Sequence, residues 1–268
     1  MRTVSKPRHH AALAETVSFD LILTCRTGLH IGAGKSQDLT GTDLPILRDA
    51  RAEPMIPGSS LRGVLRSGIE ALCAAAGINA PPGEAEDSSE EAARFHGLWT
   101  RLSPVERLFG HVETDHRRRS EQVQAYGSRL YISDLHCREE RASVALRDGV
   151  AISRETRTAA GGALFDFEVV AAGTSFRGRV RLLNPDPYEI GLLAQALWML
   201  DEGVLLLGGK KARGLGWVQV AVTEPRSQSA KDILKRVSHE ELHENPGTVS
   251  DKMAAALTEL RAFIGKEG

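Results

Sequence analysis

The chain has 268 residues, of which 41% are hydrophobic and 26% charged, and its formal net charge is −1. This composition is typical of a globular protein with a sizeable core, and the near-neutral charge excludes a uniformly basic protein that coats nucleic acid without specificity. We expect a cytoplasmic protein without a membrane partner, because no apolar run is long enough to span a membrane and the N-terminal segment lacks the apolar core of a secretory signal. The three cysteines are widely spaced, which favours buried thiols over a disulfide framework or a zinc ribbon.

The first half of the chain predicts a strand, a loop, a second extended run and a helix. A short apolar run at 17–24 predicts a buried strand, and "LPIL" at 44–47 resumes an extended run after a glycine-rich loop. The clearest element is a helix over about 60–76, with serines at its N-cap and Gly77 at its C-cap. An insertion, 78–127, then begins as a linker rich in Pro, Gly, Ser and Glu and contains a short capped helix at "SPVERLFGH".

The second half predicts more strands and one further apolar helix. "SRLYISDLHC" predicts a strand, and "GALFDFEVVAAGTSFRGRVRLL" predicts a hairpin of two strands joined at Ala172 and Gly173. "PYEIGLLAQALWMLDEG" predicts a helix, with Pro187 near its first turn and Gly203 after its end. A strand then flanks each side of a glycine loop, and we expect 226–268 to be a helical extension. This order favours a single α+β domain over 1–268, with a ferredoxin-like (RRM-like) core and insertions.

The stretch "LLLGGKKARGLGWVQV" places three cations among four glycines, between two apolar runs. It is neither a Walker nor a Rossmann phosphate loop, because strand residues continue where those motifs open a helix. Two interpretations remain, a turn whose backbone and cations approach a nucleic acid, or a hairpin with solvated lysines. The residues concerned are Gly208, Gly209, Lys210, Lys211, Arg213 and Gly214.

A second group of candidate residues lies between 28 and 66. His30 stands in a glycine-rich loop, and Asp43 comes directly before "LPIL". The start of the predicted helix is a natural phosphate site, because its free amides, its hydroxyls and its arginines can all donate to an anion, although the serines alone also suffice as a helix cap. The candidates at this helix start are Ser59, Ser60, Arg62 and Arg66.

Three motifs in this order are more specific together than any one glycine loop. They are "GLHIGAGKSQDLTGTDLPILRD" with "PMIPGSSLRGVLR", then "SRETRTAAGGALFDFEVV", then "LLLGGKKARGLGWVQV". Over 17–222 the chain resembles the RAMP superfamily of CRISPR-associated proteins, most closely the repeated (Csm/Cmr-like) backbone subunit of type III effector complexes. The resemblance implies an RRM-like palm with an inserted thumb hairpin. It also implies that copies stack with other effector subunits along a CRISPR RNA and its target RNA in antiviral defence.

The resemblance also implies roles for particular residues. In the family, the thumb pushes a base out of the guide–target duplex at regular intervals, which gives Arg154, Thr156 and Arg157 this role here. The guide backbone lies against the helix start and the glycine loop. The residues that match these positions are Ser59, Ser60, Arg62, Arg66, Gly208, Gly209, Lys210, Lys211, Arg213 and Gly214.

Active family members cut target RNA in a metal-dependent reaction at an aspartate that matches Asp43 in "GTDLPIL". A carboxylate there would hold Mg²⁺ or another divalent cation, or orient a 2′-hydroxyl as nucleophile. His30 would shape its loop or contact RNA. Asp38 and Asp49 are competing carboxylates.

Two alternatives to this role remain open. The chain could be a structural subunit of the same complex that binds RNA but does not cut it, or a stand-alone endoribonuclease that processes precursor CRISPR RNA. A zinc site is a separate possibility that is compatible with any of these roles, since some family members carry zinc in the insertion. Its candidate ligands are His96, His111, His116, His136 and Cys137.

Overall fold

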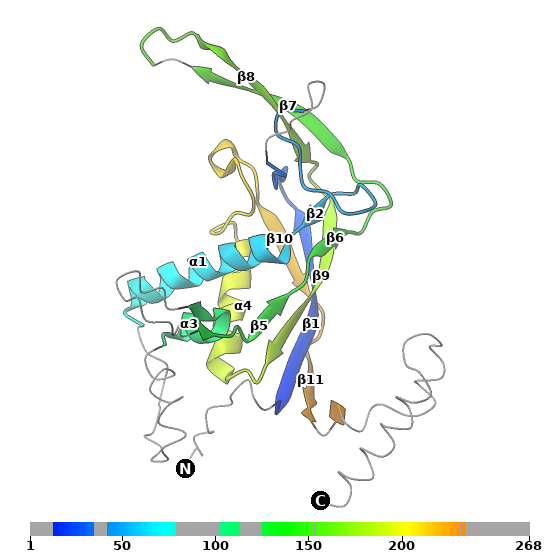
Figure 1. Ribbon diagram of the computed structural model, residues 1–268, viewed down its shortest axis with the longest axis vertical. Coiled ribbons are helices and arrows are strands. Elements are labelled where there is room, and N and C mark those ends of the chain that lie inside the picture. Colours follow the sequence, from blue (N-terminus) through cyan, green and yellow to red (C-terminus); the bar gives the residue numbers. More distant parts are fainter. Residues whose placement is uncertain are drawn as a thin grey trace, which may run out of the picture.

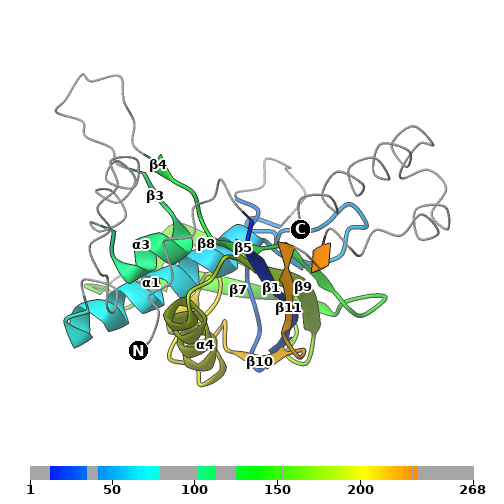
Figure 2. The ribbon, with the colours of Figure 1, turned by 90° about the horizontal axis from the view of Figure 1, so that it is seen from below.

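The structure is a computed structural model that describes residues 13–34, 42–78, 102–112, 125–152, 154–230 and 232–233. The described chain is an α+β protein in which an antiparallel sheet carries its helices on one face (Figures 1 and 2). A long two-stranded hairpin projects from one end of the sheet (Figure 1). None of the described helices is long and apolar enough to cross a membrane.

The main sheet has seven strands, and β1 lies at its centre. β1 pairs with β9 along one edge and with β10 and β11 along the other, and β5, β6 and β2 complete the sheet beyond β9. Residues alternate along β1 as a two-residue period requires, so that Leu21 and Leu23 face the helices while Ser18 and Asp20 face away. The strands are β1 (Glu15–Cys25), β2 (Met55–Ile56), β5 (Leu130–Ile132), β6 (Leu135–Cys137), β9 (Ser175–Leu183), β10 (Val218–Val222) and β11 (Arg226–Ser229).

Three helices cover the inner face of this sheet: α1 (Gly58–Ala76), α3 (Pro104–Phe109) and α4 (Pro187–Asp201). Gly77 ends α1 in the left-handed region with φ 68°, as predicted. The serines predicted to cap α1 do not, because Pro57 holds the N-cap position and the helix already includes Ser59 and Ser60. The short helix in "SPVERLFGH" and the helix that begins at Pro187 are both confirmed, and each starts with a capping box.

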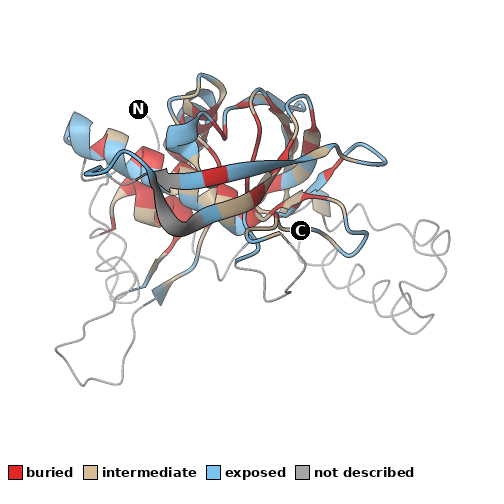
Figure 3. Ribbon diagram, turned by 90° about the horizontal axis from the view of Figure 1, so that it is seen from above, coloured by how far each residue is buried: buried red, intermediate tan, exposed pale blue. Residues whose placement is uncertain are grey.

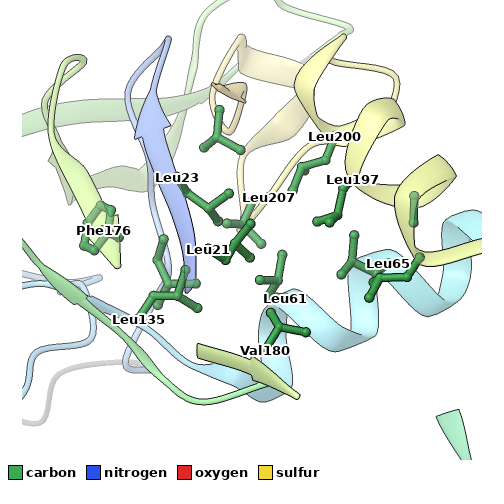
Figure 4. Close-up of a cluster of buried hydrophobic side chains, with 14 of the residues drawn as sticks. Leu21, Leu23, Leu61, Leu65, Leu135, Phe176, Val180, Leu197, Leu200 and Leu207 are labelled. Atoms are coloured by element: carbon green, nitrogen blue, oxygen red, sulfur yellow. The ribbon is translucent and has the colours of Figure 1, made fainter. Parts of the chain in front are cut away.

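The hydrophobic core lies between the sheet and α1 and α4. Leucines of β1 meet leucines of both helices, and Phe176 and Val180 of β9 close the cluster from the next strand (Figure 4). Cys25, Cys73 and Cys137 are buried and free, as expected for core thiols. Burial raises the pKa of the Cys25 thiol to about 12, so this sulfur stays protonated at neutral pH.

The projecting hairpin consists of β7 (Val144–Ile152) and β8 (Ala159–Val170). The prediction that β8 and β9 pair as a hairpin is therefore wrong. Both strands exist, but a turn that contains Gly173 (φ 90°) sends β9 into the main sheet while β8 pairs with β7. Much of the projecting hairpin is exposed (Figure 3), and even Leu146 and Leu164 are more than half accessible to solvent.

Four further predictions change in detail. "SRLYISDLHC" forms two short strands, β5 and β6, interrupted at Ser133 and Asp134. No strand forms at 205–207, where the chain is irregular and the Leu207 amide donates to the Gly216 carbonyl. "LPIL" is extended but forms only isolated bridges. The predicted helical extension begins as a strand, because residues 226–229 pair with β1 as β11, and residues 234–268 lie outside the described residues.

Residues 79–101 and 113–124 of the insertion also lie outside the described residues. The described part contains α3 and a small two-stranded sheet of β3 (His111–Val112) and β4 (Ala125–Tyr126).

Candidate functional site

The candidate site lies at the base of the projecting hairpin, where the four residues of the sequence "FDFE" in β8 contact the other parts of the site. Since neighbouring residues of a strand point to opposite faces, Phe165 and Phe167 share one face and Asp166 and Glu168 the other. The aromatic pair meets the glycine loop, and the acidic pair meets the segment that begins at Asp43.

Asp43 is joined to Asp166 by two reciprocal hydrogen bonds. The Asp43 amide donates to Asp166 Oδ1 at 2.6 Å, and the Asp166 amide donates to Asp43 Oδ2 at 3.0 Å. Leu44 then forms a parallel bridge to Phe167, through hydrogen bonds of its amide and carbonyl with the Asp166 carbonyl and the Glu168 amide. The Asp43 residue is nevertheless exposed, so its carboxylate is held from one side and accessible from the other.

Glu168 fixes the rest of the extended segment. Its Oε2 accepts from the Ile46 amide at 2.9 Å, and its Oε1 forms an ion pair with Arg48 at 2.9 Å. Ile46 in turn bridges to Gly32, so "LPIL" runs between β8 and the loop that contains His30. The predicted extended run is therefore present, but side chains supply several of the contacts that a strand ladder would supply.

His30 is buried, with 6% of its surface exposed, and it supports the glycine loop from below. Its Nδ1 lies 2.8 Å from the Glu168 carbonyl oxygen and therefore donates to it, while the rings of His30 and Phe167 pack edge to face. Its own carbonyl accepts from the Gly209 amide at 2.8 Å. Of the two predicted roles for His30, this geometry favours shaping the loop.

The glycine loop closes with a single 3₁₀ turn, Lys211–Arg213, rather than with a hairpin. Lys210 adopts a left-handed conformation with φ 60°, and its Nζ lies 4.4 Å from the Phe165 ring centre and 4.8 Å from that of Phe167. Arg213 lies 5.5 Å from the Phe165 ring. Partial burial, together with the nearby Arg213 charge, lowers the pKa of Lys210. Two of the three predicted cations thus face aromatic rings of β8.

A groove of about 990 Å³ separates α1 from the glycine loop. The α1 residues that line it are mostly small, so a partner's backbone can approach the helix closely. Lys211 lines the groove and supplies a positive charge there. The α1 and loop residues that line it include Ser59, Ser60, Gly63, Ser67, Ala71, Gly208 and Gly209.

Arg62 and Arg66 do not line this groove. The Nη2 group of Arg62 donates to the Phe109 carbonyl, and Nη1 of Arg66 donates to the Gly110 carbonyl at 3.2 Å. Arg66 also forms an ion pair with Glu70 at 2.7 Å. Both guanidinium groups therefore satisfy carbonyls at the C-terminal end of α3. Their contact with RNA stays a prediction.

The remaining candidates lie apart from the groove. Arg154, Thr156 and Arg157 are exposed in the turn between β7 and β8. This turn is the end of the hairpin that lies far from the main sheet (Figure 1). Asp49, a competing carboxylate, is held in a turn. Burial opposes ionisation of this carboxyl, but hydrogen bonds from the Arg51 and Glu53 amides and from the Arg51 and His136 side chains lower its pKa to about 2. Asp38 lies outside the described residues.

Three of the predicted zinc ligands, His111, His136 and Cys137, lie within the described residues, and they do not come together in one site. His111 contacts Glu106 at 2.7 Å, whereas His136 contacts Asp49 at 3.2 Å and the Cys137 thiol donates to Glu139 at 3.0 Å. Within the described part of the chain, no three metal-binding side chains come together. His96 and His116 lie outside it.

Sequence reasoning missed the four residues of β8 that assemble the site, Phe165, Asp166, Phe167 and Glu168. A usable signal was present, because "FDFE" alternates large aromatic and acidic residues with a two-residue period. Such a strand presents an apolar face and a charged face at once.

The protein has an antiparallel α+β fold with a projecting hairpin, and an exposed carboxylate is held at the base of that hairpin. The chain belongs to the RAMP superfamily, whose family model matches residues 22–219. It is 26% identical to a CRISPR system Cms endoribonuclease Csm3 of Methanocaldococcus jannaschii over 251 residues, which cover 91% of each chain. It is 52% identical to the Csm3 endoribonuclease of Methanothermobacter thermautotrophicus over 50 residues, which are 18% of this chain and 20% of that one. A chain of the "Type III-B Cmr-beta Cryo-EM structure of the Apo state" is similar with a TM-score of 0.47 and 13% identity, and the match covers 77% of this chain and 97% of that chain.

Proposed function

We propose that this protein is a backbone subunit of a type III CRISPR effector ribonucleoprotein, which binds CRISPR RNA and cleaves complementary target RNA. The full-length similarity to a Csm3 endoribonuclease supports this function. The observation that carries the proposal is the exposed Asp43 carboxylate, which Asp166 holds at the base of the hairpin. The segment that follows Asp43 bridges to Gly32, and Gly32 lines the groove.

The main sheet is proposed to be the ferredoxin-like palm of such a subunit. β1, α1, β5 with β6, β9, α4 and β10 follow one another in a β-α-β-β-α-β order, and the strands lie side by side as β10-β1-β9-β6. The β7–β8 hairpin would then be the thumb, and Arg154, Thr156 and Arg157 at its tip would contact the guide–target duplex.

The groove between α1 and the glycine loop is the proposed binding site for the guide backbone. The N-terminal end of α1 lies in the groove, where the hydroxyls of Ser59 and Ser60 can donate to phosphate and the helix dipole favours an anion. Gly208 and Gly209 permit close approach on the opposite wall, and Lys211 adds charge. The chain needs no strongly basic surface for this binding, because its donors converge on one groove.

Asp43 is the proposed catalytic residue for target cleavage. Its carboxylate would accept a hydrogen bond from the 2′-hydroxyl of a target nucleotide and orient that oxygen toward the adjacent phosphorus. The 2′-oxygen would bond to phosphorus as the bond to the 5′-oxygen breaks, which leaves a 2′,3′-cyclic phosphate and a 5′-hydroxyl that takes up the proton. A displaced base would allow the backbone to reach the in-line geometry that this reaction needs.

A divalent cation such as Mg²⁺ fits the donors around Asp43. Mg²⁺ is usually held by one or two carboxylates, with substrate phosphates and water completing the shell, and Asp43 offers an exposed carboxylate with that of Asp166 nearby. When bound, the ion would neutralise negative charge on the phosphate. Zinc elsewhere in the chain stays a prediction.

The test is Asp43→Ala in the complex assembled with its guide and partner subunits. We expect guide binding and assembly to match the wild type, while target cleavage falls by at least about 100-fold, the loss typical when a group that acts on the reacting atoms is removed. Cleavage at the wild-type rate and spacing would assign this chain the structural, non-cleaving role. Cleavage of repeat RNA by the isolated protein would instead support the stand-alone processing enzyme.

A further inference from the structure

The contact between Asp43 and Asp166 joins two parts of the chain that lie 123 residues apart in sequence. Asp166 belongs to β8, close to the point where the hairpin leaves the body of the protein, and Asp43 precedes the extended segment "LPIL". The backbone contacts that hold this segment on β8 begin at Leu44, whose amide donates to the Asp166 carbonyl. Asp43 itself lies beyond that backbone pairing.

The Asp43 amide therefore depends on a side chain for its hydrogen bond. Among the described residues, its one acceptor is Asp166 Oδ1, at 2.6 Å. The return bond, from the Asp166 amide to Asp43 Oδ2 at 3.0 Å, fixes the orientation of the Asp43 carboxylate and leaves Oδ1 without a hydrogen bond in the described part of the chain. Two bonds in opposite directions restrain both the position and the rotation of this group.

We propose that Asp166 is a positioning residue, which fixes the Asp43 carboxylate on the base of the thumb so that carboxylate and thumb move as one unit. This inference rests on the proposed role of Asp43 in cleavage. Asp166 acts by accepting the Asp43 amide proton through Oδ1. A 1 Å displacement of a reacting group can lower a rate by about 100-fold. The loss of this bond therefore lowers the rate of target cleavage and leaves guide affinity unchanged.

The competing role for Asp166 is direct ligation of a cation, and asparagine separates the two roles. Asn keeps an oxygen acceptor of the same size and reach, but it has no negative charge. A positioning role therefore survives Asp166→Asn, whereas a ligand role is weakened by it and raises the concentration of divalent cation that the reaction requires. Asp166→Ala removes the acceptor and abolishes both roles.

A matched control stands on the neighbouring strand. Asp148 of β7 lies directly opposite Asp166 in the hairpin register. Within the described part of the chain, no hydrogen bond or ion pair involves its carboxylate. Asp148→Ala therefore removes the same charge from the same place in the hairpin and leaves the acceptor of the Asp43 amide intact.

The experiment measures single-turnover target cleavage by the assembled complex, with a titration of MgCl₂ and separate measurement of guide affinity. We expect Asp166→Ala to lower the cleavage rate about 10- to 100-fold at unchanged guide affinity and target KM. Asp166→Asn should recover most of that rate at an unchanged half-saturating MgCl₂ concentration, and Asp148→Ala should behave as the wild type. If Asp166→Ala fails to assemble, Asp166→Val serves in its place, since valine suits a strand and also lacks the acceptor.

A wild-type rate in both Asp166→Ala and Asp166→Val would overturn the inference, as would equal losses in the Asn and Ala variants with a raised MgCl₂ requirement. Asp43→Ala is measured alongside. If it keeps full cleavage, the proposed function has failed. If it abolishes cleavage while Asp166→Ala does not lower it, the function stands and only the positioning role is wrong.

Discussion

Replacing Gly208 by alanine tests whether the glycine loop is held by close packing on His30. Gly208 has φ 80°, and a Cβ atom built there would lie 2.4 Å from the His30 carbonyl oxygen and 3.1 Å from its carbon. Both atoms are backbone, so the loop must move away. Gly214, in the same loop, also has φ 80°, but an added Cβ atom would meet nothing within 4 Å.

The pair of variants isolates the packing contribution. Both pay the same left-handed penalty of about 1–2 kcal/mol for a non-glycine residue, and both restrict the unfolded chain in the same way. The close contact with two backbone atoms of His30 costs a further 1–3 kcal/mol or so, as overpacking does, and displacement of the loop would also weaken the hydrogen bond from Gly209 to His30. We therefore expect Gly208→Ala to be less stable than Gly214→Ala by about 1–3 kcal/mol.

The assay is urea unfolding of the two purified variants beside the wild type, followed by guide RNA binding at one fixed salt concentration. Gly208 lines the groove and Gly214 does not, so the loss of guide affinity should also be larger for Gly208→Ala. Equal free energies of unfolding for the two variants would refute the packing argument. Unequal stability with equal guide affinity would show that the loop does not form a wall of the RNA site.

Two further predictions concern charged groups. Lys211→Ala should reduce the slope of log affinity against log salt concentration by about 0.7, the value for one phosphate contact on a single strand; an unchanged slope would show that this lysine does not touch phosphate. Glu189 is fully buried and forms an ion pair with buried Arg129 at 3.0 Å, so Glu189→Ala should lower the free energy of unfolding by about 3–5 kcal/mol in chemical denaturation. A loss below about 1 kcal/mol, the range of a surface pair, would show that the remaining partners of Arg129 compensate fully.

Local signals in the sequence were reliable where a single element determines them. The short apolar run that predicts a strand at 17–24, the C-cap glycine at Gly77 and the proline at Pro187 each depend on neighbouring residues alone, and each corresponds to an observed element. Pairing depends on distant partners instead. The turn after Val170 in "FEVVAAGTSFRG" has the residues of an ordinary hairpin turn, which is why the sequence predicts that β8 pairs with β9. Nothing in this stretch reveals that β8 pairs with β7 instead.

The difference between local signals and contacts with distant segments also explains which parts of the site could be predicted from the sequence. His30, Asp43 and the glycine loop belong to motifs, whereas the acceptor of the Asp43 amide lies on a strand 123 residues away. The helix serines illustrate the opposite error, since a Ser pair at a predicted helix start is read as a cap. Pro57 takes the cap position here, and this shift frees the hydroxyls of Ser59 and Ser60 to face the groove.

Strand β8 connects the parts of the site, because this one element of 12 residues runs from the buried core toward the tip of the hairpin. At about 3.3 Å per residue it spans about 40 Å. Val169 and Val170 anchor it in the protein interior, and Phe167 and Glu168 hold the glycine loop and the Asp43 segment directly above that anchor. A backbone pairing with β7 on one side and with Leu44 on the other restrains the strand from both edges. The Asp43 carboxylate and the glycine loop therefore contact the same strand, the carboxylate through Asp166 and the loop through the rings of Phe165 and Phe167.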